Sequence, residues 1–240
     1  MLQISRKELE RISRSILRNY LALCQDKPDH IDPVDFTKKI CGLDFQFCNL
    51  SYRNYMKGLS IQDADKYGIS IEVWGKEGLI SSCPISSTSI FIDERLLDEP
   101  NAGLRNFTMM HETAHRLLEA KFPTQYKAPE HPTPRCGGHG QSSITNWYEW
   151  QTDVFASYLL LPRELIHKHM ERVGFKDNIR LLNRVFAPRD YERFCNMADA
   201  LGVSKTALSI RLDQMGLISR NDFRHPYDLV SIYPEKWEVA

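Results

Sequence analysis

Two histidines and a glutamate near the middle of the chain have the types and spacing of a metal site. His111, Glu112 and His115 form an HExxH pattern within the segment FTMMHETAHRLL. On a helix of 3.6 residues per turn the two histidines lie one above the other, so both imidazoles reach the same ion. Glu112 lies about 100° around the helix, where its carboxylate reaches a water molecule beside the ion without binding the ion. The pattern predicts a zinc centre that hydrolyses peptide bonds.

The helix around these histidines has one apolar face, and both imidazoles lie on it. The same face carries Leu104, Phe107, Thr108 and Leu118. Histidines that point inward need polar partners, because an unpaired polar group is costly to bury. A hydrogen-bonded core pair or a solvated patch is the alternative, since HExxH also arises by chance. A third ligand elsewhere in the chain favours the metal site.

A catalytic zinc site uses three protein ligands and leaves the fourth position for water. The segment NWYEWQTDVFASYLLLP offers an acidic residue, Glu149, 34 residues after His115. A second inward-facing helical stripe contains Glu149, Asp153, Ala156 and Leu160. Because exposed acids rarely share a face with Ala and Leu, we predict Glu149 as the third ligand. Asp153 is expected to accept the free ring N–H of a zinc-bound histidine, and a pair of exposed helix acids is the alternative.

This ligand set specifies the expected chemistry. Zinc on two neutral imidazoles and one carboxylate lowers the pKa of a bound water towards neutrality and polarises a substrate carbonyl. Glu112 is the expected general base, which takes the proton from water and passes it to the leaving amine. One Zn²⁺ per chain is the predicted cofactor, although the same ligand types also accept manganese or iron.

Beyond the ligands themselves, the two segments resemble the ImmA/IrrE family of metallopeptidases. The resemblance rests on HETAH and on the later pattern E-x-x-x-D-x-F-A-x-x-L-L-x-P. It extends to MADALGVSKTALSIRLDQMGL, which is similar to the short helix-turn-helix that commonly ends these proteins. By position, it implies the same ligands and general base. Thr152 and Leu161 depart from the commonest pattern, where alanine and methionine are usual, and neither is expected to contact a ligand.

The resemblance also implies a function. Members of the family are typically cytoplasmic regulators of mobile elements, phages or stress responses that cleave or otherwise inactivate a helix-turn-helix repressor. We therefore expect a zinc-dependent endopeptidase of limited specificity with a repressor protein as substrate. The alternative is a DNA- or repressor-binding transcription regulator, or a toxin-antitoxin component, with a non-catalytic metal site. Glu112 discriminates between them, because a purely structural site does not need it.

Composition indicates a soluble globular protein. Lys plus Arg and Asp plus Glu both total 31 in 240 residues, so net charge does not favour a nucleic acid or an anionic membrane as partner. Six cysteines without a CxxC pair are expected to be free thiols in a reducing compartment. The first twenty residues hold no long apolar run, which argues against a signal peptide or a membrane span. The expected location is the cytoplasm.

The periodicity predicts an α+β fold, with a small mixed or antiparallel sheet packed on the HExxH helix and further helices. We expect an N-terminal helical region over residues 1–60, a metallopeptidase core over 61–170 and a C-terminal helical region over 171–240. The last contains a helix-turn-helix-like segment over 194–217. Cap and breaker signals predict helices over Arg6–Cys24, Asp32–Gly42, about Asp98–Lys121, a stretch ending before Pro162, Arg163–Arg172 and Asn178–Phe186.

β structure is expected between Ser60 and Leu97, and its last strand precedes the HExxH helix. We expect this strand to form the edge of the sheet beside the cleft, where an extended peptide adds through main-chain hydrogen bonds. An ordinary interior strand is the alternative. The residues of the expected edge are Thr88, Ser89, Ile90, Phe91 and Ile92.

The roles of two further segments, residues 122–146 and the helix-turn-helix-like tail, are open to more than one interpretation. Residues 122–146 contain four prolines and three glycines, which predicts a long loop able to cover the site. Its groups able to reach the metal or an oxyanion are Tyr126, His131, Arg135, Cys136 and His139, with Cys136 as an inhibitory ligand or Cys136 with His139 as a second zinc site. In the tail, DNA reading depends on Lys205, Ser209 and Arg211 beside Asp213, so we favour packing or partner docking.

Overall fold

The computed structural model describes residues 4–50, 57–59, 65, 68, 70–74, 80–98, 102–123 and 143–219. The fold is α+β, as the sequence predicts. The chain forms two compact units, Met1–Leu160 and Leu161–Ala240. The HExxH segment lies in the first unit together with the two N-terminal helices. The predicted division into regions 1–60, 61–170 and 171–240 stays a prediction.

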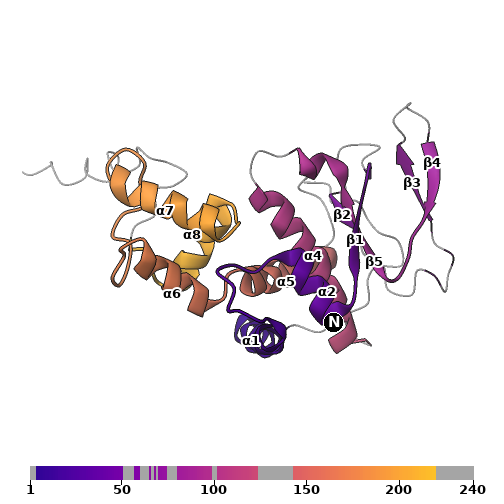
Figure 1. Ribbon diagram of the computed structural model, residues 1–240, viewed down its shortest axis with the longest axis horizontal. Helices are drawn as coiled ribbons and strands as arrows, with labels where there is room; N and C mark the ends of the chain where they lie inside the picture. The colour runs from indigo at the N-terminus through magenta and orange to yellow at the C-terminus, as the bar shows by residue number, and fades with distance from the viewer. Residues whose placement is uncertain are drawn as a thin grey trace, which may run out of the picture. The chain divides into compact units, whose positions relative to one another are not determined.

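The two N-terminal helices begin and end at the residues that their capping signals indicate. Helix α1 (Arg6–Leu23) starts after Ser5, whose side chain accepts a hydrogen bond from the backbone N–H of Glu8. Helix α2 (Pro33–Cys41) starts after Asp32 and ends at Gly42, which has a left-handed φ of 68°. Helix α1 packs on α5 (Ser143–Leu160), and helix α2 packs on α4 (Ala102–Lys121) (Figure 1). Both helices therefore support the helices that carry the candidate metal ligands.

The sheet of the first unit is small and mixed. Strand β5 (Ser89–Asp93) pairs in parallel with β1 (Asp44–Cys48) and antiparallel with the two-residue strand β2 (Gly58–Leu59), in the order β1-β5-β2. Strands β3 (Ser70–Trp74) and β4 (Ile80–Pro84) form a separate antiparallel pair. All five residues of β5 are buried, because β5 is the central strand.

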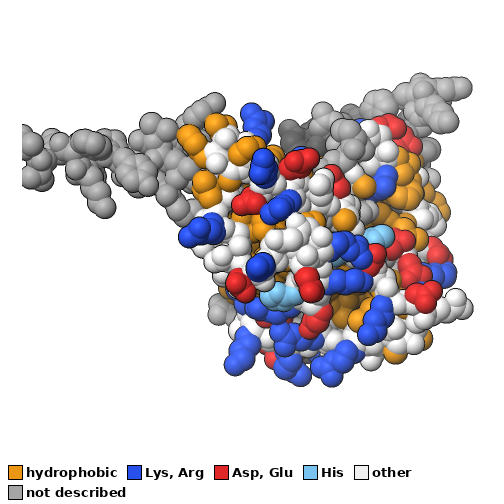
Figure 2. Space-filling view, turned by 60° about the vertical axis from the view of Figure 1, so that its left-hand side comes forward, with side chains coloured by type: hydrophobic (Ala, Val, Ile, Leu, Met, Phe, Trp, Pro, Cys, Tyr) orange, Lys and Arg blue, Asp and Glu red, His pale blue; other side chains and the backbone are white. Residues whose placement is uncertain are grey.

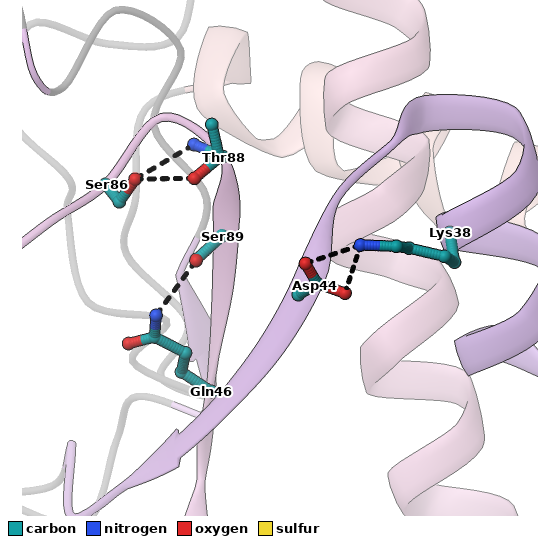
Figure 3. Close-up of polar contacts among 6 residues, drawn as sticks. All are labelled: Lys38, Asp44, Gln46, Ser86, Thr88 and Ser89. Carbon is teal, nitrogen blue, oxygen red and sulfur yellow. Dashed lines mark hydrogen bonds and ion pairs between the residues drawn. The ribbon is translucent and has the colours of Figure 1, made fainter.

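Polar contacts fix the register between α2, β1 and β5 (Figure 3). Lys38 Nζ lies 2.7 Å from both carboxylate oxygens of Asp44, which joins the end of α2 to the start of β1. Gln46 Nε2 donates to Ser89 Oγ at 2.9 Å across the β1-β5 pair. The ion pair is exposed and contributes little to stability, but the Gln46 contact is partly buried and holds the parallel pair in register.

The prediction that Thr88, Ser89, Ile90, Phe91 and Ile92 form the free edge beside the site is wrong. β1 pairs with β5 from Ser89 onwards, and the carbonyl of Thr88 accepts a hydrogen bond from the backbone N–H of Asp44. On the other side, β2 pairs with Phe91 and Ile92. The interior-strand alternative describes β5, and β2 occupies the edge instead.

Helix α4 (Ala102–Lys121) carries the HExxH pattern and lies between the sheet and helix α5 (Ser143–Leu160) (Figure 1). The short 3₁₀ helix η1 (Glu94–Leu97) precedes α4. Apolar side chains of the sheet and α4 form one cluster, whose buried members are Leu43, Ile90, Ile92, Leu96 and Met109. Most of the circumference of α4 is buried, so the position of its histidines is determined by packing on several sides.

The second unit contains α6 (Arg163–Arg172), α7 (Pro188–Ala200) and α8 (Lys205–Gln214). The turn between α7 and α8 has Gly202 at φ 65° and Ser204 as N-cap, as the tail pattern predicts. The predicted helix over Asn178–Phe186 is wrong. Ile179 forms a parallel bridge with Ile218, and Asn183 Oδ1 accepts the backbone N–H groups of the two residues before Ala187, which makes a turn.

In the described part of the chain, the surface carries charges of both signs and the cysteines are free thiols. Figure 2 shows Lys and Arg interspersed with Asp and Glu on the face in view. The cysteines Cys24, Cys41, Cys48, Cys83 and Cys195 are free, as predicted, and Cys136 lies outside the described residues. Burial raises the pKa of the Cys41 thiol, and that of Cys48, to about 11. No helix among the described residues has the length and apolar character needed to cross a membrane.

Two of the three donors expected for DNA contact on α8 point into the second unit. Arg211 is 2% exposed and its Nε donates to the carbonyl of Leu161 at 3.1 Å. Ser209 is 4% exposed, and its hydroxyl donates to the carbonyl of Thr206. Only Lys205 keeps a partly exposed side chain. The helix therefore packs through these residues rather than presenting them to a partner.

Because Arg211 is buried and hydrogen-bonded, we expect Arg211→Ala to lower the free energy of unfolding by about 3 kcal/mol. Chemical denaturation of the full chain, followed by circular dichroism, measures the change. Arg180→Ala removes an exposed arginine of the same unit and should change stability by less than about 0.5 kcal/mol. Equal stability of the two variants would show that Arg211 has no structural role.

Candidate metal centre

Helices α4 and α5 bring two histidines and one glutamate to a single point. His111 and His115 lie one turn apart on α4, and Glu149 reaches them from α5. The Nε2 atoms of the two imidazoles are 2.9 Å apart. Glu149 Oε2 lies 3.3 Å from Nε2 of His111, and its Oε1 lies 3.6 Å from Nε2 of His115. Each residue offers one ligand atom, and these atoms lie within 4.8 Å of one another.

These separations fit a divalent metal ion. Zinc binds histidine nitrogen and carboxylate oxygen at about 2.0 to 2.2 Å in tetrahedral geometry, which separates neighbouring ligand atoms by about 3.3 Å. The closest contacts among the three residues, 2.9, 3.3 and 3.6 Å, lie on both sides of that value. Two imidazoles and one carboxylate are also a donor set that zinc accepts, with a fourth position left for water.

The hydrogen-bond partner of Nδ1 of His111 determines whether Nε2 of the same ring presents a lone pair to the site. Nδ1 of His111 lies 2.8 Å from Asp153 Oδ1, and an ionised carboxylate only accepts hydrogen bonds. Nδ1 therefore carries the proton, and in the neutral ring Nε2 presents a lone pair. This lone pair points towards Nε2 of His115 and the Glu149 carboxylate. When Nε2 of His115 is also unprotonated, three lone-pair donors face one point, and a cation there removes their mutual repulsion.

Thr152 contacts His115, contrary to the expectation that this departure from the family pattern lies away from the ligands. Its Oγ1 lies 3.4 Å from Nδ1 of His115. The residue is fully buried on α5, directly before Asp153. Its position in the sequence carries a signal, because it is the third residue after Glu149 and a helix brings such residues to one face.

Glu112 is not one of the three clustered residues, and its side chain packs against the sheet. Its side chain is buried, and it contacts the backbone of Gly58 in β2. A Cβ atom at Gly58 would lie 2.7 Å from Cγ and 2.8 Å from Oε1 of Glu112, closer than packed atoms approach. The Glu112 side chain therefore occupies the space that any other residue at position 58 would need. No periodic pattern in the sequence identifies Gly58, because β2 has only two residues.

The loop residues expected near the site lie outside the described residues. Tyr126, His131, Arg135, Cys136 and His139 all belong to the undescribed stretch 124–142. Their expected contacts with the metal, and the second zinc site of Cys136 with His139, stay predictions.

Comparison with known proteins does not assign the chain to a family. No model of a known protein family matches the chain, and no curated protein matches it significantly. The structure thus supports a candidate metal-binding centre, compatible with a metal-dependent function, on the geometry of His111, His115 and Glu149 alone.

We expect the purified chain to bind one zinc ion, and Asp153→Asn to weaken zinc binding by about tenfold to a hundredfold because Nδ1 of His111 loses its charged partner. Competition with a chromogenic chelator measures the affinity, and His111→Ala should retain no stoichiometric metal. Asp199→Asn, an exposed aspartate of α7, is the matched control. Unchanged affinity in Asp153→Asn would remove Asp153 from the centre.

Proposed function

We propose that this protein is a zinc-dependent endopeptidase of limited specificity, related to the ImmA/IrrE family that it resembles, and that it cleaves a helix-turn-helix repressor protein. One observation carries the enzymatic part. Three ligand atoms converge from α4 and α5, while a second acid, the buried Glu112, is outside this cluster and packs against Gly58 of β2. A purely structural site has no use for that separate carboxylate.

The residues divide the work of hydrolysis between them. His111, His115 and Glu149 would hold a zinc ion, which when bound polarises a carbonyl and lowers the pKa of a water molecule. Glu112 takes a proton from the attacking water on its carboxylate and returns it to the leaving amine. Asp153 keeps the proton on Nδ1 of His111, so that Nε2 stays available as a ligand.

Strand β2 offers the main-chain edge for an extended substrate. The backbone N–H of Asp93 donates to the carbonyl of Lys57, so these two residues are a hydrogen-bonded pair. Opposed residues of an antiparallel pair alternate, so Gly58, opposite Ile92, directs its N–H and C=O away from β5. Within the described residues, no strand pairs with that side of β2. We propose that a substrate peptide pairs there, beside Glu112.

The proposed substrate is a protein rather than DNA, and the resemblance supplies the repressor as its class. The balanced charge of 31 basic and 31 acidic residues gives no electrostatic attraction to nucleic acid. In the second unit, α8 buries Ser209 and Arg211. Exposed apolar side chains there favour a protein surface as partner, and they are Val185, Phe186 and Ile210.

We expect Glu112→Gln to bind zinc like the wild type and to lose cleavage by a factor of at least about 10² to 10⁴, because an amide cannot accept the proton. The purified protein is incubated with candidate helix-turn-helix repressors, with and without a chelator, and fragments are identified by mass spectrometry. Glu164→Gln, an exposed glutamate of α6, is the matched control and should cleave normally.

Three outcomes separate the proposal from its alternative. Zinc-dependent fragments from wild type but not from Glu112→Gln support an endopeptidase. Equal inactivation of the repressor by both proteins, without fragments, indicates stoichiometric binding by a regulator or a toxin-antitoxin component. Cleavage that persists in Glu112→Gln would remove Glu112 as the general base.

A second prediction concerns the space at Gly58. Gly58→Ala should leave zinc affinity within about twofold of wild type but lower cleavage by about tenfold or more, because the added methyl displaces the general base. The matched control is Gly42→Ala, where the structure has nothing within 4 Å of an added Cβ, although its left-handed backbone costs stability. Full activity of Gly58→Ala would show that the position of Glu112 tolerates such a shift.

A further inference from the structure

We propose that Thr152 is a positioning residue of the metal centre, which fixes the His115 imidazole in the tautomer that directs Nε2 to the ion. The inference rests on the metal site of the proposed function but does not depend on the reaction. Alanine is usual at this position in the family that the chain resembles. The hydroxyl of Thr152 is therefore particular to this chain.

The hydrogen bonds of Thr152 indicate which atom is the donor in its contact with His115. The hydroxyl donates to the backbone carbonyl of Tyr148, one turn earlier on α5, at 3.0 Å. A hydroxyl has a single proton, so when Oγ1 donates it to Tyr148, Oγ1 offers only lone pairs to the His115 ring. Oγ1 lies 3.4 Å from Nδ1 of His115, which is a long hydrogen bond. Nδ1 must then carry the proton for the contact to be favourable.

A proton on Nδ1 leaves the lone pair of the neutral ring on Nε2. Nε2 of His115 is the atom that faces Nε2 of His111 at 2.9 Å and Glu149 Oε1 at 3.6 Å. The opposite tautomer would direct an N–H into the ligand cluster and remove one of the three ligands. Thr152 therefore acts on the metal through His115 and without touching the ion.

The two histidines are held by consecutive residues of one helix. Asp153 contacts Nδ1 of His111, and Thr152 contacts Nδ1 of His115. The partners differ in charge and exposure, since the Asp153 side chain is 47% exposed and Thr152 is fully buried. The buried hydroxyl of Thr152 is neutral, so it adds no charge beside the His115 imidazole. Thr152 and Asp153 therefore hold both imidazole rings with only one carboxylate in contact with their Nδ1 atoms.

The test replaces the hydroxyl without changing the shape of the side chain. Thr152→Val should weaken zinc binding by about tenfold, the lower end of the range for such partners, because the lost contact is neutral and long. Thr152→Ser keeps the hydroxyl and should stay within about twofold of wild type. Chelator competition on the full chain, without any substrate, gives the affinities, so the outcome is independent of whether a repressor is cleaved.

A matched control separates this effect from a general loss of packing. Thr113 on α4 is also fully buried and donates its hydroxyl to the carbonyl four residues earlier, Met109, at 2.9 Å. Its other partner is Thr37 on α2 rather than a ligand. Thr113→Val should therefore lower stability as Thr152→Val does, and should leave zinc affinity unchanged.

Nuclear magnetic resonance of zinc-loaded protein, labelled at histidine, reports the coordinating nitrogen directly. We expect Nε2 coordination of His115 in wild type and Thr152→Ser, and a mixture of tautomers at His115 in metal-free Thr152→Val. Coordination through Nδ1 in wild type would overturn the proposal. So would equal zinc affinity in Thr152→Val and wild type, or an equal loss in Thr152→Ser and Thr152→Val, which would assign the effect to packing.

Discussion

The structure depends on the electrostatics of three electron-rich atoms held close together. The Nε2 atoms of His111 and His115 are 2.9 Å apart, and a carboxylate oxygen of Glu149 lies within 3.6 Å of each. Asp153 keeps the proton of His111 on the far side of its ring, so a neutral imidazole there presents its lone pair to the others. Only a proton or a metal ion compensates this repulsion in a partly buried place, and the separations fit a divalent metal ion.

The N-terminal helices explain why two separate helices can hold this arrangement. On α5, Gln151 is fully buried and accepts the backbone N–H of Ile4 at 2.7 Å, immediately before the two residues that contact the histidines. On α4, Thr113 follows Glu112 and shares a buried hydrogen bond of 2.7 Å with Thr37 of α2. Each metal helix is thus fixed at the level of the site by a segment from the first forty residues. The N-terminal part, which contributes no ligand, restricts the relative movement of the ligands.

Helical periodicity and local capping signals predicted the ends of several helices and the residue on α5 that meets the histidines. Caps at Asp32, Gly42 and Ser204 gave helix ends correctly, because a cap is satisfied by residues within one turn. The helical stripe through Glu149 indicated the residue that meets the histidines, because periodicity specifies a face. Features set by distant contacts were missed. The two-residue strand β2 is too short to have a period, and the buried Arg211 donates its hydrogen bond to the carbonyl of Leu161, fifty residues earlier.

His111 and Glu112 are adjacent in the HExxH pattern, but their side chains pack against different parts of the first unit. His111 points to the ligand cluster, while the next side chain turns towards β2 and lies against the one residue type that leaves room for it. Gly58 lies in a strand, so its lack of a side chain is required by space rather than by an unusual backbone conformation. A larger residue at position 58 would displace the Glu112 side chain from this place. Gly58 in the edge strand thus leaves the space that the buried Glu112 side chain occupies, which the proposed role of Glu112 requires.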